Sequence, residues 1–181
     1  MLAALASGGL IAYPTESVIG LGCDPANEVA VRRLLAMKQR PEHKGLILVA
    51  ANQQQVAPWV AGLSREQREQ LDASWPGPVT WLLPDDKHRV PTWIKGAHSR
   101  VAIRVSAHPV VQALCLAWGG PLVSTSANVA GWPPARSILG FQHHLFRTRL
   151  PVDYVVPGFT QGLKNPTEIR DLISGKRIRT G

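Results

Sequence analysis

The sequence has little of what would build a metal centre, a disulfide framework or a membrane span. Its 181 residues include two cysteines, Cys23 and Cys115, which lie far apart in the chain. This argues against a zinc site or a disulfide scaffold and predicts a protein of the reducing cytoplasm. No run reaches the roughly 18 apolar residues of a membrane helix, so we expect no contact with a membrane. The first residues lack the basic segment of a signal peptide and read as the last turns of a helix.

Acidic residues are absent from a long internal stretch. None lies between Asp86 and Asp153, although the whole chain has a formal net charge of +8. The stretch carries eight basic residues, which are Lys87, Arg89, Lys95, Arg100, Arg104, Arg136, Arg147 and Arg149. This asymmetry predicts a positive face or cleft for an anionic ligand, and a general contribution to solubility is the alternative.

Length and composition predict one globular domain over residues 1–181, since 45% of the residues are hydrophobic. Several predicted strands follow one another without an intervening helix, so we expect an α+β fold in which helices flank a twisted mixed sheet. Capping and proline signals place helix starts at Asp24, Ser64 and Ser106, and another helix covers 138–147. The predicted strands cover residues 10–13, 46–49, 79–83, 101–105, 122–123, 153–156, 167–173 and 176–179.

Small polar side chains follow the apolar run 122–123, and they are Ser124, Thr125, Ser126 and Asn128. They read as the carboxyl end of a buried strand that opens into a loop, which is where open α/β sheets place their ligands. Hydroxyl and amide groups suit hydrogen bonding to phosphate, ribose or an amino acid. Because the cluster contains no strong acid or base, it predicts a site that holds and orients a ligand.

Several charged or glycine-bearing segments have two readings each. Arg104 interrupts an apolar strand, so it either grips a carboxylate or forms a structural salt bridge, because an unpaired buried charge is costly. Lys38, Arg40 and Lys44 either stabilise the end of the first helix or hold a triphosphate. Residues 14–24 lack the lysine of a P-loop and the third glycine of a dinucleotide fingerprint, so a tight turn explains them equally well.

Known catalytic signatures are missing. There is no Gly-x-Ser-x-Gly elbow and no His-Glu-x-x-His, and the six histidines show no metal-ligand spacing. We therefore expect no metal bound directly by the protein. The polar, turn-rich residues 84–99 are a candidate lid.

Six motifs occur in an order that resembles one protein family, the YrdC-like threonylcarbamoyl-AMP synthases in their short bacterial form. They are Tyr-Pro-Thr-Glu-Ser-Val-Ile-Gly-Leu-Gly (13–22), Lys-Gln-Arg-Pro (38–41), Trp-Pro-Gly-Pro-Val-Thr (75–80), Val-Ala-Ile-Arg-Val (101–105), Val-Ser-Thr-Ser-Ala-Asn-Val-Ala-Gly (123–131) and Asn-Pro-Thr-Glu-Ile-Arg-Asp (165–171). The resemblance covers essentially the whole chain. It implies a YrdC/RibB-like fold around a large, positively charged cleft.

The resemblance also implies a reaction and its site. L-Threonine, bicarbonate or CO2 and ATP, the last with Mg²⁺ on its phosphates, would give threonylcarbamoyl-adenylate and pyrophosphate, the first step of t6A formation at adenosine 37 of tRNA. Lys38 and Arg40 would act in catalysis on the ATP phosphates. The nucleotide would also contact Arg100, Ser126, Asn128 and Arg179. Threonine would contact Thr15, Arg104, Ser124 and Thr167, with its carboxylate on Arg104.

The chain departs from the family pattern in two places. It lacks the additional C-terminal domain of the longer members, and we expect its N-terminal helix to be shortened. Transfer proteins for the t6A pathway are the implied partners. The alternative function is an RNA-binding or ribosome-maturation factor of the same fold, in which RNA or tRNA contacts the basic stretch directly.

Overall fold

A nine-stranded sheet runs through the computed structural model, which describes residues 1–128, 131–148 and 152–180. The described strands follow the order β7-β1-β2-β6-β3-β5-β4-β8-β9. Parallel pairs are β1 with β7, β3 with β5 and β4 with β8, and the other neighbours are antiparallel, which confirms the mixed sheet. The strands are β1 (Ile11–Pro14), β2 (Ile19–Gly22), β3 (Ile47–Ala50), β4 (Val79–Pro84), β5 (Arg100–Val105), β6 (Leu122–Ser126), β7 (Tyr154–Val155), β8 (Glu168–Asp171) and β9 (Arg177–Arg179).

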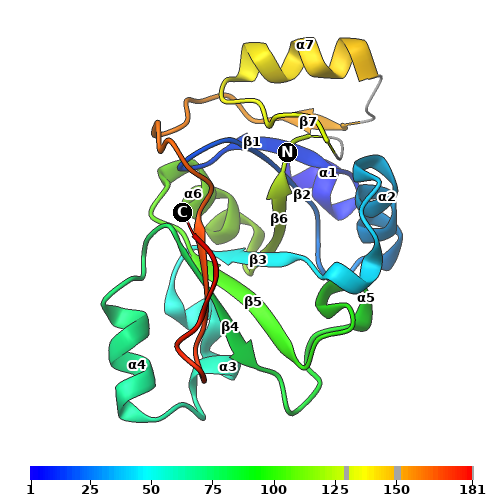
Figure 1. Cartoon of the computed structure of the whole chain (residues 1–181). Coiled ribbons are helices and arrows are strands. Elements are labelled where there is room, and N and C mark those ends of the chain that lie inside the picture. Colours follow the sequence, from blue (N-terminus) through cyan, green and yellow to red (C-terminus); the bar gives the residue numbers. More distant parts are fainter. Residues whose placement is uncertain (129–130, 149–151, 181) are drawn as a thin grey trace.

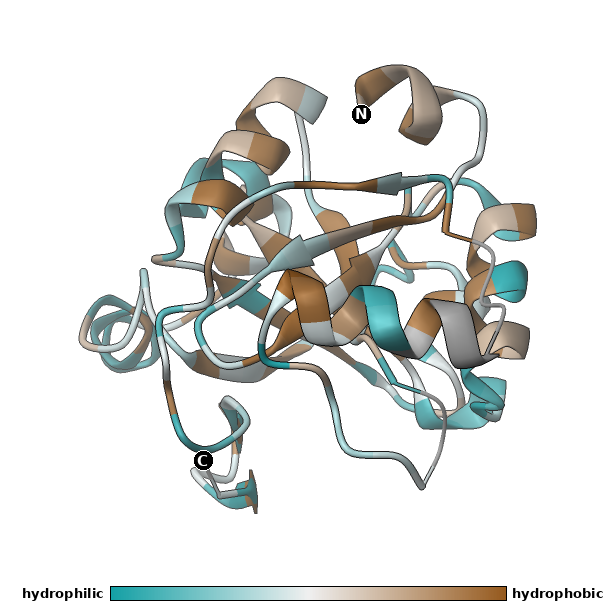
Figure 2. Ribbon diagram, turned by 90° about the horizontal axis from the view of Figure 1, so that it is seen from above, coloured by the Kyte–Doolittle hydropathy of each residue, from teal (hydrophilic) through white to brown (hydrophobic). Residues whose placement is uncertain are grey.

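Helices cover the sheet and complete its core (Figure 1). They are α1 (Leu2–Ala6), α2 (Glu28–Lys38), α3 (Ala57–Val60), α4 (Arg65–Asp72), α5 (Thr92–Lys95), α6 (Pro109–Trp118) and α7 (Ile138–Thr148), with 3-10 turns at η1 (Glu42–Lys44) and η2 (Gln53–Val56). Strand β1 is buried on both faces of the sheet, and its alternate side chains point to opposite faces. Ala12 joins the core beneath α2, whereas Ile11 and Tyr13 join a second cluster with α1 and α6. Helix α7 lies over the end of the sheet that β7 and β1 form (Figure 1). Hydrophobic and hydrophilic residues alternate along the helix (Figure 2).

Local capping explains where three helices begin, and it corrects two of the predicted starts. Helix α4 has the predicted capping box on Ser64. Helix α2 is capped by Asn27, because Asp24 closes a preceding turn by accepting from the Ala26 amide (2.9 Å). Helix α6 is capped by His108, whose ring accepts from the Val110 amide (3.2 Å), whereas Ser106 Oγ accepts from the His108 amide (3.1 Å) just before the helix.

Two strands differ from the sequence prediction near the polar cluster. The segment predicted as a loop or tight turn contains β2, which pairs with β1 and β6. Strand β6 continues through Ser126 and is antiparallel to both β2 and β3, so Ser124 and Thr125 lie on a strand. The prediction that the strand ends at Val123 and opens into a loop at Ser124 was therefore wrong. None of the described helices has the length and apolar character needed to cross a membrane.

Candidate functional site

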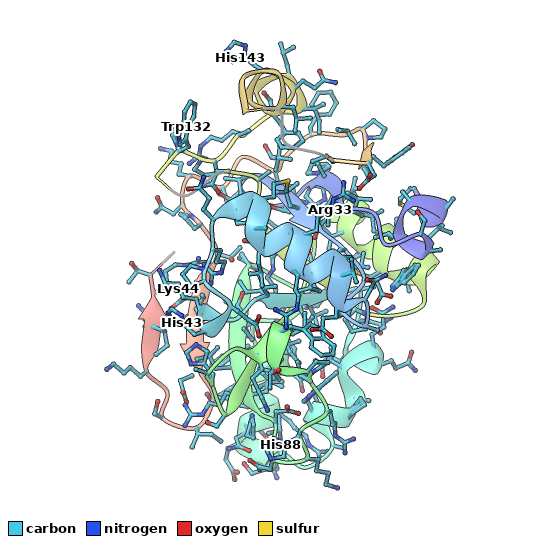
Figure 3. All side chains as sticks on the ribbon, turned by 90° about the vertical axis from the view of Figure 1, so that its right-hand side faces the viewer. Arg33, His43, Lys44, His88, Trp132 and His143 are labelled. Atoms are coloured by element: carbon cyan, nitrogen blue, oxygen red, sulfur yellow. The ribbon has the colours of Figure 1, made fainter. Side chains whose placement is uncertain are left out.

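A cavity of about 740 Å³ brings the sequence-predicted residues together. The β1–β2 turn, β5, β6 and the C-terminal β8–β9 segment contribute to its walls. In Figure 1 the C-terminal strands lie in front of β4 and β5, and Figure 3 shows Lys44, another lining residue, beside them. Nine of the ten predicted site residues line it, and they are Thr15, Arg40, Arg100, Arg104, Ser124, Ser126, Asn128, Thr167 and Arg179.

The cavity lining is basic. No aspartate or glutamate is found among its described residues, whereas Arg40, Arg104 and Arg179 come to it from three distant parts of the chain. Burial lowers the pKa of Arg179, and the charges of Arg104 and Arg40 lower it further. The three guanidinium groups are therefore close enough to repel one another, which makes the cavity suited to anions.

Arg40 lines the cavity and is held in place by backbone oxygens. The chain turns beyond α2 at Gln39, which has a φ of 50°. Arg40 then donates from Nε (3.1 Å) and Nη2 (2.9 Å) to the carbonyl of Gly45. Burial lowers the pKa of Arg40. Its neutral partners leave the positive charge available to a phosphate.

Lys38 is the one predicted site residue outside the cavity lining. Its buried ammonium donates to the carbonyls of Ser126 and Asn128, the latter at 2.9 Å. Burial, and then the charge of Arg40, lower the pKa of Lys38 to about 8. Within the same loop the Ser126 hydroxyl donates to Asn128 Oδ1 at 2.6 Å. Lys38 thus ties the end of β6 to α2, and its direct contact with phosphate stays a prediction.

Arg104 forms a buried salt bridge, which is one of its two sequence readings, and its contact with a substrate carboxylate stays a prediction. It is 5% exposed, and its Nη1 donates to Glu16 Oε2 at 2.8 Å. Glu16 Oε1 accepts from Ser106 Oγ at 2.7 Å. Sequence reasoning missed Glu16 as the partner, although a carboxylate beside an apolar strand was a signal that a buried cation faced it. Arg104 is therefore ion-paired on one side and lines the cavity on the other.

The remaining polar residues of the cavity are fixed by contacts with neighbours. Thr15 Oγ1 donates to the Val18 carbonyl (2.7 Å) within the β1–β2 turn. The Tyr13 phenol donates to the carbonyl of Val123 (3.3 Å), the residue before Ser124, and burial raises the pKa of the phenol. Arg179 Nε donates to the Thr167 carbonyl (3.0 Å), and this closes the C-terminal wall.

Carboxylates from other parts of the chain neutralise some of the cations of the acid-free stretch. Lys95 pairs with Asp85 (3.0 Å), Arg100 with Asp171 and Arg104 with Glu16, and each carboxylate lies outside the stretch. The side chain of Arg147 and all of Arg149 lie outside the described residues. Lys95, Arg100 and Arg104 all line the cavity, so the lining cations without a described ion pair, Arg40, Lys44 and Arg179, come from outside the acid-free stretch.

The candidate lid is anchored along most of its length. Asp85 accepts from the amides of Arg89 (3.0 Å) and Val90 (3.2 Å) as well as from Lys95. The segment contains the unpredicted helix α5, and its exposed residues 97–99 line the cavity. Movement of the segment stays a prediction. In the described part of the chain, no three His, Cys, Asp or Glu side chains are grouped as metal ligands.

The mixed sheet and the arginine-lined cavity are those expected of a YrdC-like protein, and the comparisons show the same fold and family. The profile of the Sua5–YciO–YrdC family, described as "Telomere recombination", matches residues 3–181. The chain therefore belongs to this family. It is 53% identical over 180 residues to the threonylcarbamoyl-AMP synthase of Xanthomonas euvesicatoria, covering 98% of this chain and 94% of the relative. The Halorhodospira halophila synthase is also 53% identical, over 98% of this chain and 91% of the relative.

Solved structures show the same arrangement. Sua5 of P. abyssi complexed with L-threonine superposes with a TM-score of 0.84 at 28% identity, and the match covers 94% of this chain and 49% of that one. The chain thus spans about half of the longer P. abyssi protein. YciO of E. coli shares the fold, with a TM-score of 0.77 at 24% identity over 94% of this chain and 81% of that one.

Proposed function

We propose that the chain is a threonylcarbamoyl-AMP synthase, which converts L-threonine, bicarbonate or CO2 and ATP into threonylcarbamoyl-adenylate and pyrophosphate. The observation that carries this proposal is the 53% identity to such synthases over nearly the whole chain. The cavity supports it, because about 740 Å³ lies within the usual range for ligand sites and the lining attracts anions. The P. abyssi relative complexed with L-threonine supports the amino-acid substrate.

The proposed chemistry needs no nucleophile from the protein. The amine of threonine adds to CO2 and loses a proton, which gives a carbamate anion. A carbamate oxygen attacks the α-phosphorus of ATP, the bond from that phosphorus to the bridging oxygen breaks, and pyrophosphate leaves. What the protein must supply is placement of the two reactants and neutralisation of the developing negative charge.

The polar residues of the cavity divide between the two substrates in this proposal. Arg40, with Lys38 behind the loop, serves the phosphates, and the nucleotide also contacts Arg100, Ser126, Asn128 and Arg179. Threonine contacts Thr15, Arg104, Ser124 and Thr167. The lining offers guanidinium and hydroxyl groups and no described carboxylate, so its donor set does not fit a resident metal ion. Mg²⁺ belongs to the substrate in this proposal and arrives on the ATP phosphates.

The product sets the wider role of the enzyme. Threonylcarbamoyl-adenylate is an activated group donor, so transfer proteins must pass its threonylcarbamoyl group to adenosine 37 of tRNA. We place this activity in the cytoplasm, where ATP, threonine and tRNA meet.

A three-substrate assay tests the function directly. Purified protein should release pyrophosphate only when L-threonine, bicarbonate and Mg-ATP are all present. Release that does not depend on threonine would contradict the proposal. RNA binding with a steep salt dependence, unaffected by Arg104→Ala and without pyrophosphate release, would instead favour the RNA-binding alternative.

Two arginine substitutions test the division between the substrates. Arg40→Ala should raise the KM for ATP, whereas Arg104→Ala should raise the KM for threonine by about 10- to 100-fold, the range for a lost hydrogen bond to a charged group. The exposed Arg89→Ala is the matched control and should leave both KM values unchanged. Unchanged threonine kinetics in Arg104→Ala would show that its carboxylate role is wrong.

A further inference from the structure

Ser17 is a buried residue of the cavity that the sequence comparison did not single out. It lies on the turn between β1 and β2, is 2% exposed and lines the cavity. Its hydroxyl has no hydrogen-bond partner among the described residues. A buried hydroxyl without a hydrogen-bond partner lowers stability. Its presence in a ligand cavity therefore indicates that a ligand supplies the missing partner.

A second buried donor in the same cavity also lacks a partner. Among the described atoms of this kind, two belong to residues that line the cavity, Ser17 Oγ and Arg104 Nε. Arg104 Nη1 is engaged by Glu16, so Nε remains for another acceptor. Both atoms can donate a hydrogen bond, and neither has an acceptor in the described structure.

Glu16 links the turn that carries Ser17 to Arg104. It directly precedes Ser17 in the chain and accepts from both Arg104 and Ser106, so it fixes the turn against β5. Thr15 cannot supply the second donor, because its hydroxyl hydrogen is directed at the Val18 carbonyl. Ser17 is therefore the hydroxyl of this turn that is able to donate to a ligand.

We infer that Ser17 is a substrate-contacting residue whose hydroxyl, together with Arg104 Nε, donates to the carboxylate of the amino-acid substrate. One carboxylate has two acceptor oxygens and satisfies both donors. Glu16 acts as a positioning residue, since it orients Arg104 without reaching the cavity lining. This inference rests on the amino-acid substrate of the proposed function.

Calorimetric titration with L-threonine tests the contact without requiring turnover. Ser17→Ala should weaken threonine binding by about tenfold or more, the effect of a lost hydrogen bond to a charged group. Its melting temperature should not fall, because the substitution removes a hydroxyl without a partner. The KM for ATP should not change.

Thr80→Val is the matched control. Thr80 Oγ1 is also buried without a partner among the described residues, but Thr80 lies on β4 and is not among the residues that line the cavity. This variant should bind threonine as the wild type does. A loss in Thr80→Val equal to that in Ser17→Ala would overturn the inference, because the effect would then be a general response of the sheet.

1-Amino-2-propanol, which is threonine without its carboxylate, identifies the substrate group that Ser17 contacts. Because this compound has no carboxylate oxygen to accept from Ser17, the difference between wild type and Ser17→Ala should shrink to near zero. A difference that persists would assign the hydroxyl to another group of the substrate and overturn the inference, as would unchanged threonine binding in Ser17→Ala. If the wild-type protein binds no threonine at all, the proposed function itself fails, so the two failures are distinguishable.

Discussion

Lys38 and Arg104 are both buried cations, but the protein holds them by different means. Arg104 faces a carboxylate, which neutralises its charge in the folded state. Lys38 faces neutral carbonyl oxygens, so its charge is solvated by dipoles and remains uncompensated. The free energy of unfolding therefore depends on pH through Lys38, in a pH range where ordinary lysines do not titrate.

Activity should report the protonation of Lys38. Its pKa is about 8, and the ammonium is present below that value and lost above it. We expect kcat/KM for ATP to fall by roughly tenfold for each pH unit above the pKa, because the link between α2 and the loop after β6 is lost. Lys38→Met should be impaired at every pH and lack this decline, whereas Lys87→Met, at an exposed lysine, should keep it. The same decline in Lys38→Met would assign the titration to another group.

Stability should change in the opposite direction to activity. The folded pKa of about 8 lies below the ordinary lysine value of about 10.4, so between these values the unfolded chain binds more protons. The contribution of Lys38 to the free energy of unfolding therefore rises with pH across this window. Denaturant unfolding at several pH values, compared between wild type and Lys38→Met, measures this contribution.

Most elements were predictable where one local signal dominated. The capping box at Ser64 set the start of α4, as predicted, and Gly119, with a φ of 86°, ends α6 because glycine readily adopts this conformation. Strand β2 was missed because its glycines imitate a turn when the sequence is read alone. The glycines are needed because Tyr13 packs against them: a Cβ at Gly22 would lie 2.9 Å from Tyr13 Cε1.

The close packing of β2 can be tested by adding one methyl group. In Gly22→Ala the new Cβ would overlap the Val123 carbonyl oxygen of β6 as well as the ring of Tyr13. We expect a loss of about 1–3 kcal/mol in the free energy of unfolding, as for other overpacked cores. Gly62→Ala is the control, because nothing lies within 4 Å of its added Cβ. Urea unfolding with similar losses in both variants would contradict this account.

The cavity shows what the sequence could and could not predict about the whole molecule. Seven of the nine predicted residues in its lining lie within the six family motifs, and Arg100 and Arg179 follow from the family resemblance outside them, whereas spacing and periodicity gave only separate clusters of polar groups. Pairing across the sheet brings these clusters together, so Glu16 could not be assigned to Arg104, 88 positions away, from local patterns. The acid-free stretch misled for the same reason, since its cations find carboxylates from other parts of the fold.

Assembly of three guanidinium groups in one cavity makes the protein's stability depend on anions. Because Arg179 lies within the fields of Arg104 and Arg40, a bound polyphosphate relieves their repulsion as it binds. Inorganic pyrophosphate, the proposed product, should therefore stabilise the wild-type protein, by about 2.7 kcal/mol at 100 times its Kd. Thermal unfolding at increasing pyrophosphate concentrations measures the effect, which should weaken at high salt.

Substitution on β9 separates this effect from a general response to charge. Arg179→Ala should weaken pyrophosphate binding by about tenfold, which removes about 1.4 kcal/mol of the stabilisation at a fixed, saturating concentration. Arg177→Ala removes the same charge from the same strand, but Arg177 pairs with Glu168 (2.9 Å) and is not a lining residue. It should therefore keep the wild-type response. Equal losses in the two variants would mean that pyrophosphate responds to net charge, and that β9 does not complete the binding site.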